Sequence, residues 1–565
     1  MKLTNHRIIQ FSYCLWLFFI LVSCGTIRSL KQEPSLIGYN SNTPERIKVS
    51  DSNFVYKKNS LLKNKYGLWE LYVEGDAFQI GLITGSLTQE LLINQEKAFL
   101  SKIDDLVPSK YKQAFLRKFL AWYNRKIHLN IPLEYKVEIF GLSKYFSNNY
   151  NHIAEPYLRA LYLHGAHDIG HALKDLALVG CSSFAAWGEK TEDGSLIIGR
   201  NFDFYVGDEF SKEKIIAFIN PKKGHKYMSI TWGGMLGVVS GMNEHGLTVT
   251  INAGKSKIPL VAKTPISILT KEILQYASTI DEAITIAKKR QVFVSESILI
   301  GSAKDKRAIT IEVSPKNFGV FEVTNSTQLI CSNHFQSSAY KEDKYNLKHI
   351  EESHSQYRYE RMEELLDQNK KLTPKGAVDI LRNKEGLNNK FIGYGNEKAL
   401  NQLLAHHSIV FKPEQLMFWV SSNPYQLGEY VAYDLNTIFD NSNPDTSFFQ
   451  PKLTIEKDTF QYTQAYMDYE TYRELSFQVK NKILAKETID STTLKTLEKL
   501  NPDYWKSYYL IGKYYYEKKN YSSALNQFNI ARTKEITTLQ DQREIDLYLK
   551  KIKRKLNKQF IKERR

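Results

Sequence analysis

The sequence predicts an α+β protein in which two antiparallel β-sheets lie face to face and helices cover their outer faces. Three observations support this prediction. Residues 85–175 show helical periodicity, strand-like segments begin near residue 180, and two helices separate these strands from a second group that ends near residue 425. We therefore predict a four-layer αββα body followed by a small all-α segment.

The first 24 residues predict a secretory signal. A basic start and an apolar stretch lead into Leu21-Val22-Ser23-Cys24. This tetrapeptide resembles the bacterial lipobox, whose cysteine is lipidated and becomes the first residue of the mature protein. An ordinary signal peptide or an uncleaved anchor is the alternative. Acyl chains on Cys24 would hold the protein on a membrane, so we expect a lipoprotein of the bacterial cell envelope.

The elements of the body follow in order. A polar stretch over residues 25–60 predicts a tether, and segments such as ELLINQEKAFLSKIDDLV predict helices up to residue 175. Strands from SSFAAWG to LTVTINA come next, separated by turns such as EDG and NEHG. Two helices begin at Thr264-Pro265 and at STIDEA, which carry helix-start residues. Strands from ESILIGSA to QLICSNHF, the helix YRYERMEELLDQN and late strands near SIVFKP and LMFWVSS complete the body.

The tail differs from the body. Residues 501–535 carry the Trp, Tyr, Gly, Ala and Phe spacing of a tetratricopeptide helix pair. One pair cannot bury its apolar face alone, so it must pack on a neighbour, on the body or on a protein partner. The predicted regions are a signal peptide over 1–24, a tether and helical pro-region over 25–180, the αββα domain over 181–450, and a linker with the helical tail over 451–565.

The composition is that of a globular protein. The chain has 565 residues, 42% hydrophobic and 24% charged, which excludes disorder throughout. Its formal net charge is +16, but a good share lies in KKIKRKLNKQFIKERR, residues 550–565. A solvated helix face explains this run most simply, and attraction to anionic lipid headgroups is the alternative. We expect no nucleic-acid partner.

A cysteine stands at the start of the predicted strands. The chain has four cysteines, and Cys181 directly follows Gly180. A cysteine nucleophile needs a base, for which His334 and His407 are candidates, although neither lies in a papain-type signature. The alternative base is the cysteine's own α-amine, which requires Cys181 to become an N-terminal residue. Gly180 suits such a cut, because it has no side chain to block attack of the thiol on its carbonyl.

The segments GCSSF, GRNFDF, GMNEHGLTVTINA, CSNHF and SQYRYER occur in this order. Together they resemble the penicillin (isopenicillin-N) acyltransferase-like family of cysteine N-terminal-nucleophile hydrolases, which is related to the bile-salt hydrolases. The resemblance covers roughly residues 155–425. It implies an αββα N-terminal-nucleophile fold, autocatalytic cleavage before Cys181, and hydrolysis or acyl transfer at a small-molecule amide. The sequence contains no phosphate-binding Gly loop, nucleotide motif or strong metal motif, so we expect no cofactor.

The resemblance also assigns roles around the new N-terminus. Cys181 would be the nucleophile and its freed amine the base. Arg200 suits stabilising the thiolate, and Asp203 suits holding the amine. These two residues are three apart, so on a regular strand they would point to opposite faces unless a bulge intervened. A salt bridge on a strand edge is the alternative for this pair.

Three further residues would complete the site. By the same resemblance, Asn252 would offer its amide to the oxyanion of the tetrahedral intermediate. Asn333 would line the same pocket. Arg358 matches the later arginine of the family, but Arg361 is close enough to leave both assignments open.

Two other groups of residues have more ordinary explanations. Cys331 is expected to be a buried apolar residue. His164, His167, Asp168 and His171 have a spacing that places the histidines on one helical face, where they could ligate zinc. Packing against the processing site is the explanation that we favour, so we expect no metal.

A rival hypothesis is a non-catalytic lipoprotein scaffold that binds a protein partner through its tetratricopeptide-like tail. The Cys-Arg-Asp-Asn set argues against it, because a scaffold has no need of these residue types together. The sequence therefore predicts a lipid-anchored amide hydrolase or acyltransferase.

Overall fold

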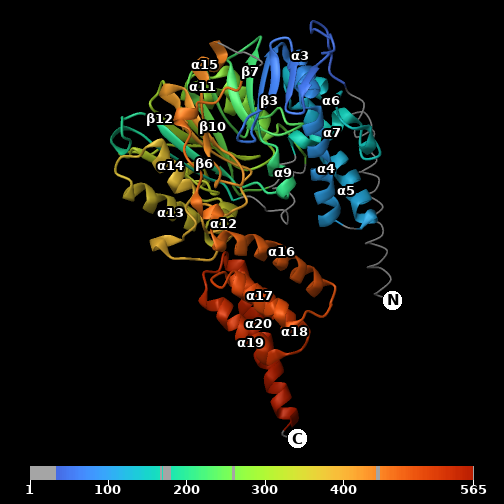
Figure 1. Ribbon diagram of the computed structural model, residues 1–565, viewed down its shortest axis with the longest axis vertical. Helices are drawn as coiled ribbons and strands as arrows, with labels where there is room; N and C mark the ends of the chain where they lie inside the picture. The colour runs from blue at the N-terminus through green and yellow to red at the C-terminus, as the bar shows by residue number, and fades with distance from the viewer. Residues whose placement is uncertain are drawn as a thin grey trace.

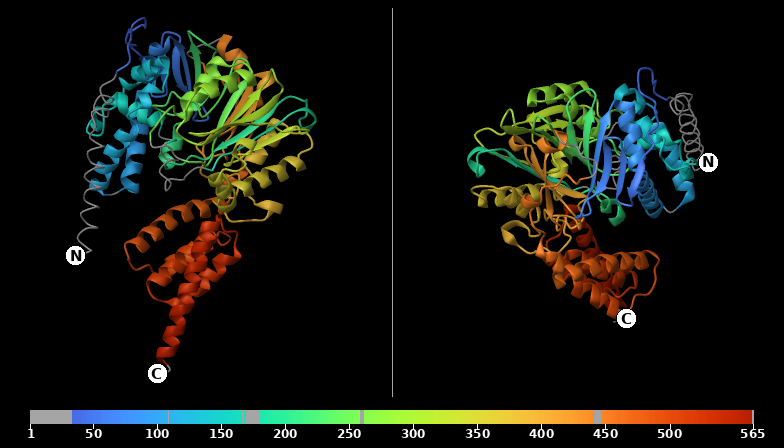
Figure 2. Two further views of the ribbon diagram at one scale, coloured as in Figure 1. Left: turned by 180° about the vertical axis from the view of Figure 1, so that it is seen from behind. Right: turned by 45° about the horizontal axis from the view of Figure 1, so that its top comes forward.

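The computed structural model describes residues 33–107, 109–165, 168, 180–257, 261–440 and 446–563. Two β-sheets with helices on their outer faces form the body, and a bundle of helices extends from one end of it (Figures 1 and 2). The predicted αββα fold class is confirmed.

The larger sheet has eleven strands, and its neighbours pair antiparallel except for β4 and β7, which are parallel. In spatial order the strands are β1 (Ile47–Ser50), β2 (Asn53–Tyr56), β3 (Asn59–Lys63), β4 (Trp69–Gly75), β7 (Ile215–Pro221), β8 (Tyr227–Thr231), β9 (Ser240–Asn243), β10 (Leu247–Ala253), β11 (Glu296–Ser302), β12 (Arg307–Val313) and β13 (Phe318–Phe321).

The smaller sheet has six antiparallel strands and packs face to face on the larger one. Its order is β14 (Gln328–Cys331), β5 (Ser182–Ala186), β6 (Ile197–Phe202), β15 (His407–Lys412), β16 (Met417–Ser421) and β17 (Tyr430–Asp434). Apolar side chains of both sheets, among them Phe218 and Met228 facing Ile409 and Phe418, form one buried cluster. This cluster is the core between the two inner layers.

Helices close the outer faces. An apolar cluster joins the larger sheet to α3 (Ala77–Leu87), α6 (Leu133–Ser143), α10 (Ile266–Tyr276) and α11 (Ile280–Lys289). Another joins the smaller sheet to α13 (Ser355–Gln368) and α14 (Pro374–Leu381). The helix starts follow capping chemistry, since the Thr279 side chain accepts a hydrogen bond from the backbone N–H of Glu282 at 3.3 Å. The remaining body helices are α4 (Gln89–Leu106), α5 (Lys110–Tyr123), α7 (Pro156–His164), α9 (Asp208–Lys212), α12 (Lys344–Glu352) and α15 (Leu435–Asp440).

The tether expected over residues 25–60 is corrected by the structure. Strands β1 to β3 lie within residues 47–63, and β4 joins them to β7 of the body. The sequence signal is weak because these strands are short and all four residues of β1 are exposed. Their partner strand lies far along the chain, so local pattern does not reveal the pairing.

The tail consists of α16 (Gln464–Leu484), α17 (Ser491–Leu500), α18 (Trp505–Glu517), α19 (Tyr521–Thr533) and α20 (Leu539–Glu563). Helices α18 and α19 pack together where the tetratricopeptide pair was predicted. Their apolar cluster includes three residues of the body, Leu403, Tyr425 and Leu427, so tail and body share a core. No helix in the described part of the chain is both long and apolar enough to span a membrane.

Candidate active site

Cys181 lies directly before β5 and is fully buried. Strands β5 and β6 pair with Ser183 opposite Arg200. Nη2 of Arg200 lies 3.6 Å from the Cys181 Sγ. The structure therefore brings the predicted nucleophile and its predicted cation into contact.

Backbone carbonyls hold the Arg200 guanidinium in place. Nη1 donates to the carbonyl oxygen of Val239 at 2.9 Å and also to the Ser240 hydroxyl, and Nη2 donates to Ile251 at 2.6 Å. The guanidinium carbon lies 4.3 Å from the centroid of the Phe202 ring. Since these groups fix the arginine, it presents a positioned positive charge to the thiol.

Asp203 follows the last residue of β6. Because β6 ends at Phe202, Asp203 no longer follows the alternation of side chains between the two faces of the sheet. Both Arg200 and Asp203 can therefore face the site. Its Oδ2 accepts a hydrogen bond from Gln402 Nε2 at 3.4 Å, and its Oδ1 has no partner among the described residues. Burial raises the pKa of Asp203 to about 7, against the opposing effects of Arg358 and Arg200. This carboxyl can exchange a proton near neutral pH.

The thiol of Cys181 is protonated in the uncleaved chain. Burial raises its pKa, the nearby Arg200 lowers it, and the negative charge of Asp203 raises it again. Activation of the thiol therefore depends on a base that takes its proton.

Arg358 on α13 completes the shell of polar contacts around Cys181, the predicted nucleophile. Its Nη1 donates to the carbonyl oxygen of Cys181 at 2.6 Å and to the Ser182 hydroxyl at 2.8 Å, and its Nη2 donates to Asn333 Oδ1 at 2.5 Å. Arg361 instead contacts Asn383, Glu364 and Asn389. Of the two arginines left open by the sequence, the structure places Arg358 at the site.

The two predicted asparagines are tied to the backbone. Asn252 on β10 accepts from the Ser183 hydroxyl at 2.8 Å and donates to the carbonyl oxygen of Cys331 at 2.8 Å. Asn333 donates to the carbonyl oxygen of Ala253 at 2.9 Å. The Asn252 Nδ2 would have to release the Cys331 carbonyl oxygen before it could donate to an oxyanion.

Gln402 is a residue of the site that sequence reasoning missed. Its Nε2 donates to the carbonyl oxygen of Gly180 at 3.0 Å. The backbone N–H of Gly180 donates to the carbonyl oxygen of Asp203 at 3.3 Å. Gln402 lies in an irregular segment between α14 and β15, where neither periodicity nor motif marks it.

No histidine donates to or accepts from the Cys181 thiol among the described contacts. His334 Nδ1 pairs with the Ser355 hydroxyl at 2.8 Å, and His407 Nε2 pairs with the Ser240 hydroxyl at 2.8 Å. The geometry does not favour a Cys–His pair. Cys331 is a free, buried thiol in the core between the sheets.

The cluster His164, His167, Asp168 and His171, which precedes Cys181 in the sequence, is only partly described. Both nitrogens of His164 contact the backbone, at Ala160 and Leu236, and burial lowers its pKa to about 4. Asp168 accepts from the backbone N–H of Ile266 at 2.8 Å, at the start of α10. His164 therefore has no free nitrogen for zinc. His167, His171 and the lipobox residue Cys24 lie outside the described residues.

A different group has metal-ligating atoms close together. His225, Glu244 and His245 lie on turns at the ends of β8, β9 and β10, with 3.1 Å between His245 Nε2 and His225 Nδ1. A hydrogen bond between the two rings accounts for this separation.

Residues 189–423 match the family described as acyl-coenzyme A:6-aminopenicillanic acid acyl-transferase. This match confirms the family resemblance over the motifs from GRNFDF to SQYRYER, and GCSSF, with Cys181, lies just before the matched range. An uncharacterized protein of Archaeoglobus fulgidus is 23% identical over 276 residues, 45% of each chain. Protein dcd1B of Dictyostelium discoideum is 22% identical over 265 residues, 45% of this chain and 51% of the relative. The chain spans about half the length of the curated relatives it matches.

Two solved structures are similar at low identity. One is a Caenorhabditis elegans ortholog of N-acylethanolamine-hydrolyzing acid amidase, with 18% identity and a TM-score of 0.31, covering 41% of this chain and 93% of that one. The other is a variant of the conjugated bile acid hydrolase of Clostridium perfringens, with 14% identity and a TM-score of 0.31, covering 49% and 97%.

Proposed function

We propose that this protein is a self-cleaving cysteine amidase or acyltransferase. The match of residues 189–423 to the acyl-coenzyme A:6-aminopenicillanic acid acyl-transferase family supports this proposal. The observation that carries the proposal is the surroundings of Cys181. The buried Cys181 thiol, directly after Gly180, has the fixed Arg200 guanidinium 3.6 Å away. The Asp203 carboxyl, whose pKa is about 7, accepts from the same Gln402 amide that donates to the Gly180 carbonyl oxygen.

Self-cleavage would prepare the nucleophile. The Cys181 sulfur attacks the carbonyl carbon of Gly180, the peptide bond breaks, and water hydrolyses the resulting thioester. The products are a carboxylate on Gly180 and a Cys181 that carries both a free thiol and a free α-amine. Such an amine has a pKa near 8 and serves as a base for its own side chain.

Turnover would then use the same residues. The amine takes the thiol proton, the thiolate attacks the substrate amide, and the leaving amine departs with that proton. Arg200 stabilises the thiolate, and the Asp203 carboxylate holds the protonated amine. Water or an acceptor amine releases the acyl group from the Cys181 thioester, so hydrolysis and acyl transfer share one intermediate.

The proposed substrate is a small-molecule amide with an apolar acyl group. Phe204, Phe210 and Trp232 form an aromatic cluster directly after Asp203, with 5.1 Å between the Phe210 and Trp232 ring centroids. Gln95 and Phe99 of α4 line the same small cavity. The cavity holds about 20 Å³, room for about one water molecule, so an acyl group would enter only if these side chains moved apart.

The lipobox supports a proposal on location. Lipidation of Cys24 would place the enzyme on a membrane of the bacterial cell envelope, where the exposed surface of the tail could meet a protein partner. A membrane-bound enzyme is well placed for substrates with apolar acyl groups, because these partition into membranes.

Trapping of the acyl-enzyme tests this function. The purified protein is mixed with a panel of N-acyl amides of increasing chain length, quenched in acid and analysed by intact mass. We expect an added acyl mass on the fragment that begins at Cys181 and none in Cys181→Ala. Absence of both acyl adduct and turnover across the panel would favour the scaffold hypothesis.

A further inference from the structure

Gln402 joins the scissile peptide bond to the helical tail. Its side chain is almost fully buried, and its Nε2 donates both to the Gly180 carbonyl oxygen at 3.0 Å and to Asp203 Oδ2 at 3.4 Å. We propose that the Gln402 amide is the oxyanion donor for self-cleavage, and that the tail holds it in place. This inference rests on the self-cleavage proposed above.

The proposed step places negative charge where Gln402 donates. As the Cys181 sulfur bonds to the carbonyl carbon of Gly180, the carbonyl π electrons move onto the oxygen, which Gln402 already binds. The thiol proton passes to the Asp203 carboxylate and then to the departing amine of Cys181. Collapse of the intermediate restores the carbonyl as a thioester, and water hydrolyses that thioester to a carboxylate and the thiol.

A fixed N–H donor stabilises such an oxygen strongly. The donor needs no rearrangement during the reaction, and it acts in a buried site where electrostatic interactions are less screened than in water. Removal of one such donor in comparable sites costs about 10²–10³ in rate. Asp203 Oδ1 has no hydrogen-bond partner among the described residues, which leaves it able to accept the thiol proton.

The fit around Gly180 explains the glycine before the cut. A Cβ at this position would lie 2.8 Å from Gln402 Nε2 and 3.3 Å from the His354 ring. A methyl group would therefore push the Gln402 amide away from the carbonyl oxygen. Glycine lets the donor approach the bond that breaks.

The segment that carries Gln402 is anchored in the tail on both sides. Leu403 is fully buried in the apolar cluster of the tail, although its φ of 54° is unfavourable for leucine. Asn396 donates to the carbonyl oxygen of Glu535, and Lys398 Nζ lies 2.6 Å from the Glu535 carboxylate. Because an unfavourable backbone persists only when its surroundings enforce it, the tail contacts fix the path of this segment.

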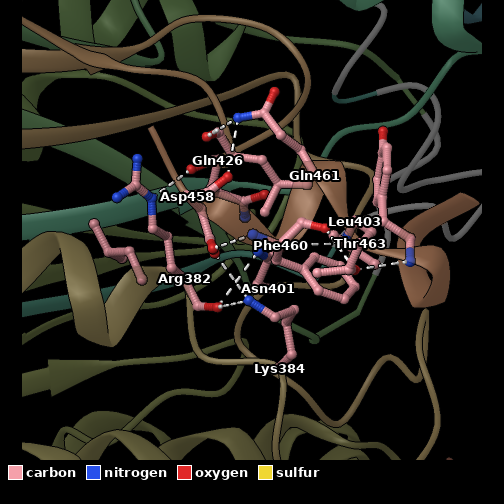
Figure 3. A network of polar contacts seen from close by, with 12 residues as sticks. Arg382, Lys384, Asn401, Leu403, Gln426, Asp458, Phe460, Gln461 and Thr463 are labelled. Atoms are coloured by element: carbon pink, nitrogen blue, oxygen red, sulfur yellow. Dashed lines mark hydrogen bonds and ion pairs between the residues drawn. The ribbon is translucent and has the colours of Figure 1, made fainter. Parts of the chain in front are cut away.

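A polar network between body and tail supports the same segment (Figure 3). Asn401 Nδ2 donates to the carbonyl oxygen of Arg382 at 3.4 Å, and Asn401 Oδ1 accepts from the backbone N–H of Leu403 at 3.0 Å. Lys384 Nζ pairs with Asp458 at 2.9 Å. The linker to the tail and the residues next to Gln402 therefore belong to one network.

Timed cleavage of the full chain tests the role of Gln402. Pulse-labelled protein from a cell-free reaction is followed by intact mass as one chain becomes two. We expect Gln402→Met, which keeps the volume but loses the N–H, to slow cleavage by about 10²–10³-fold. Gln402→Asn, which keeps a shorter amide, should recover part of this loss. Gln426→Met is the matched control, because Gln426 is equally buried at the same junction and its amide has no partner among the described residues.

The support from the tail has its own pair of variants. Leu403→Ala should slow cleavage, since a shift of the donor by about 1 Å costs on the order of 10²-fold. Leu427→Ala removes an equally buried leucine of the same cluster and should lower stability to a similar degree while cleavage stays at the wild-type rate. If cleavage slowed equally in both leucine variants, the tail would only stabilise the fold and would not position Gln402. That result would overturn this part of the proposal.

The outcomes separate this inference from the proposed function. Wild-type cleavage together with an unchanged rate in Gln402→Met overturns the oxyanion role alone. Equal slowing in Gln402→Met and Gln426→Met shows a structural effect and also overturns it. A wild-type protein that stays a single chain contradicts self-cleavage, and the inference falls with it.

Discussion

Nη1 of Arg358 lies 2.6 Å from the carbonyl oxygen of Cys181. This contact fixes the backbone of Cys181, the proposed nucleophile, on the side away from its bond to Gly180. The same guanidinium also donates to Ser182 and Asn333. A lysine has a single ammonium group and cannot make this planar set of hydrogen bonds.

Arg358→Lys should therefore reduce amide turnover by roughly 10²-fold, the usual cost of one positioned polar group. Arg361→Lys is the control, because Arg361 is equally buried on the same helix but contacts Asn383, Glu364, Asn389 and Glu385 instead of the Cys181 backbone. It should lower the melting temperature and leave kcat unchanged. Steady-state kinetics and thermal unfolding of both variants test this prediction. A loss of turnover in Arg361→Lys with unchanged turnover in Arg358→Lys would show that Arg361 is the arginine of the site.

The second prediction concerns pH and Asp203. Its pKa is about 7 in the folded chain, raised by burial from 3.8. Between pH 4 and 7 the unfolded carboxyl loses its proton while the folded one keeps it, so raising the pH favours unfolding. The stability that this group contributes is fully present below pH 4 and is lost as the pH rises through 7, a change on the order of 4 kcal/mol.

The measurement uses the uncleavable Cys181→Ala chain with and without Asp203→Asn. Denaturant unfolding from pH 4 to 8 should show that the unfolding free energy of Cys181→Ala falls relative to that of the double variant. If the difference in unfolding free energy between the two variants does not change with pH, the raised pKa of Asp203 is contradicted, because asparagine at this position does not titrate.

After the cut, the two chains should remain associated. Strands β4 and β7 pair over seven residue positions across the two products, from Trp69 and Ile215 to Gly75 and Pro221. A buried ion pair between Glu138 and Lys271 also spans them. We expect the fragments to co-elute in size-exclusion chromatography and to separate only in denaturant.

Lys271→Met measures the strength of this connection. The variant leaves Glu138 buried without its partner, which should cost about 3–5 kcal/mol. Arg307→Met breaks the exposed pair between Arg307 and Glu322 and should cost under about 1 kcal/mol. Similar losses in both variants, or fragments that separate without denaturant, would show that the buried pair does not hold the chains together.

The fourth prediction concerns Cys24. Cys24→Ser removes the thiol that lipidation requires, so the protein should leave the membrane fraction and lose incorporation of labelled fatty acid. Fractionation and labelling of a bacterial expression host check this. A substituted protein that still carries label would refute the lipobox interpretation.

The motif residues of the site were predictable from the sequence because they lie in ordered motifs. The ordered motifs and their family resemblance assigned Arg200, Asp203 and Asn252 to one site, whereas strand alternation alone predicted opposite faces for Arg200 and Asp203. The two can share the site because β6 ends at Phe202. The sequence could not choose between Arg358 and Arg361, since both fall on the buried side of one helix. Only the distances to Cys181 separate them.

Other features depend on contacts between distant segments. The parallel pairing of β4 with β7 adds four short strands to the larger sheet and leaves no local signal. Gln402 lies in an irregular segment and reaches the site through packing on the tail. The tail was expected to pack on a neighbour, on the body or on a partner, and the sequence could not choose among these; Leu403, Tyr425 and Leu427 place it in a core shared with the body.

Intact mass combined with N-terminal sequencing of the purified mature protein tests the central claim most directly. We predict two tightly associated chains, the second of which begins at Cys181, and a single inactive chain for Cys181→Ala. An active wild-type protein that remains one uncleaved chain would contradict the mechanism, because the Cys181 amine would then be locked in a peptide bond.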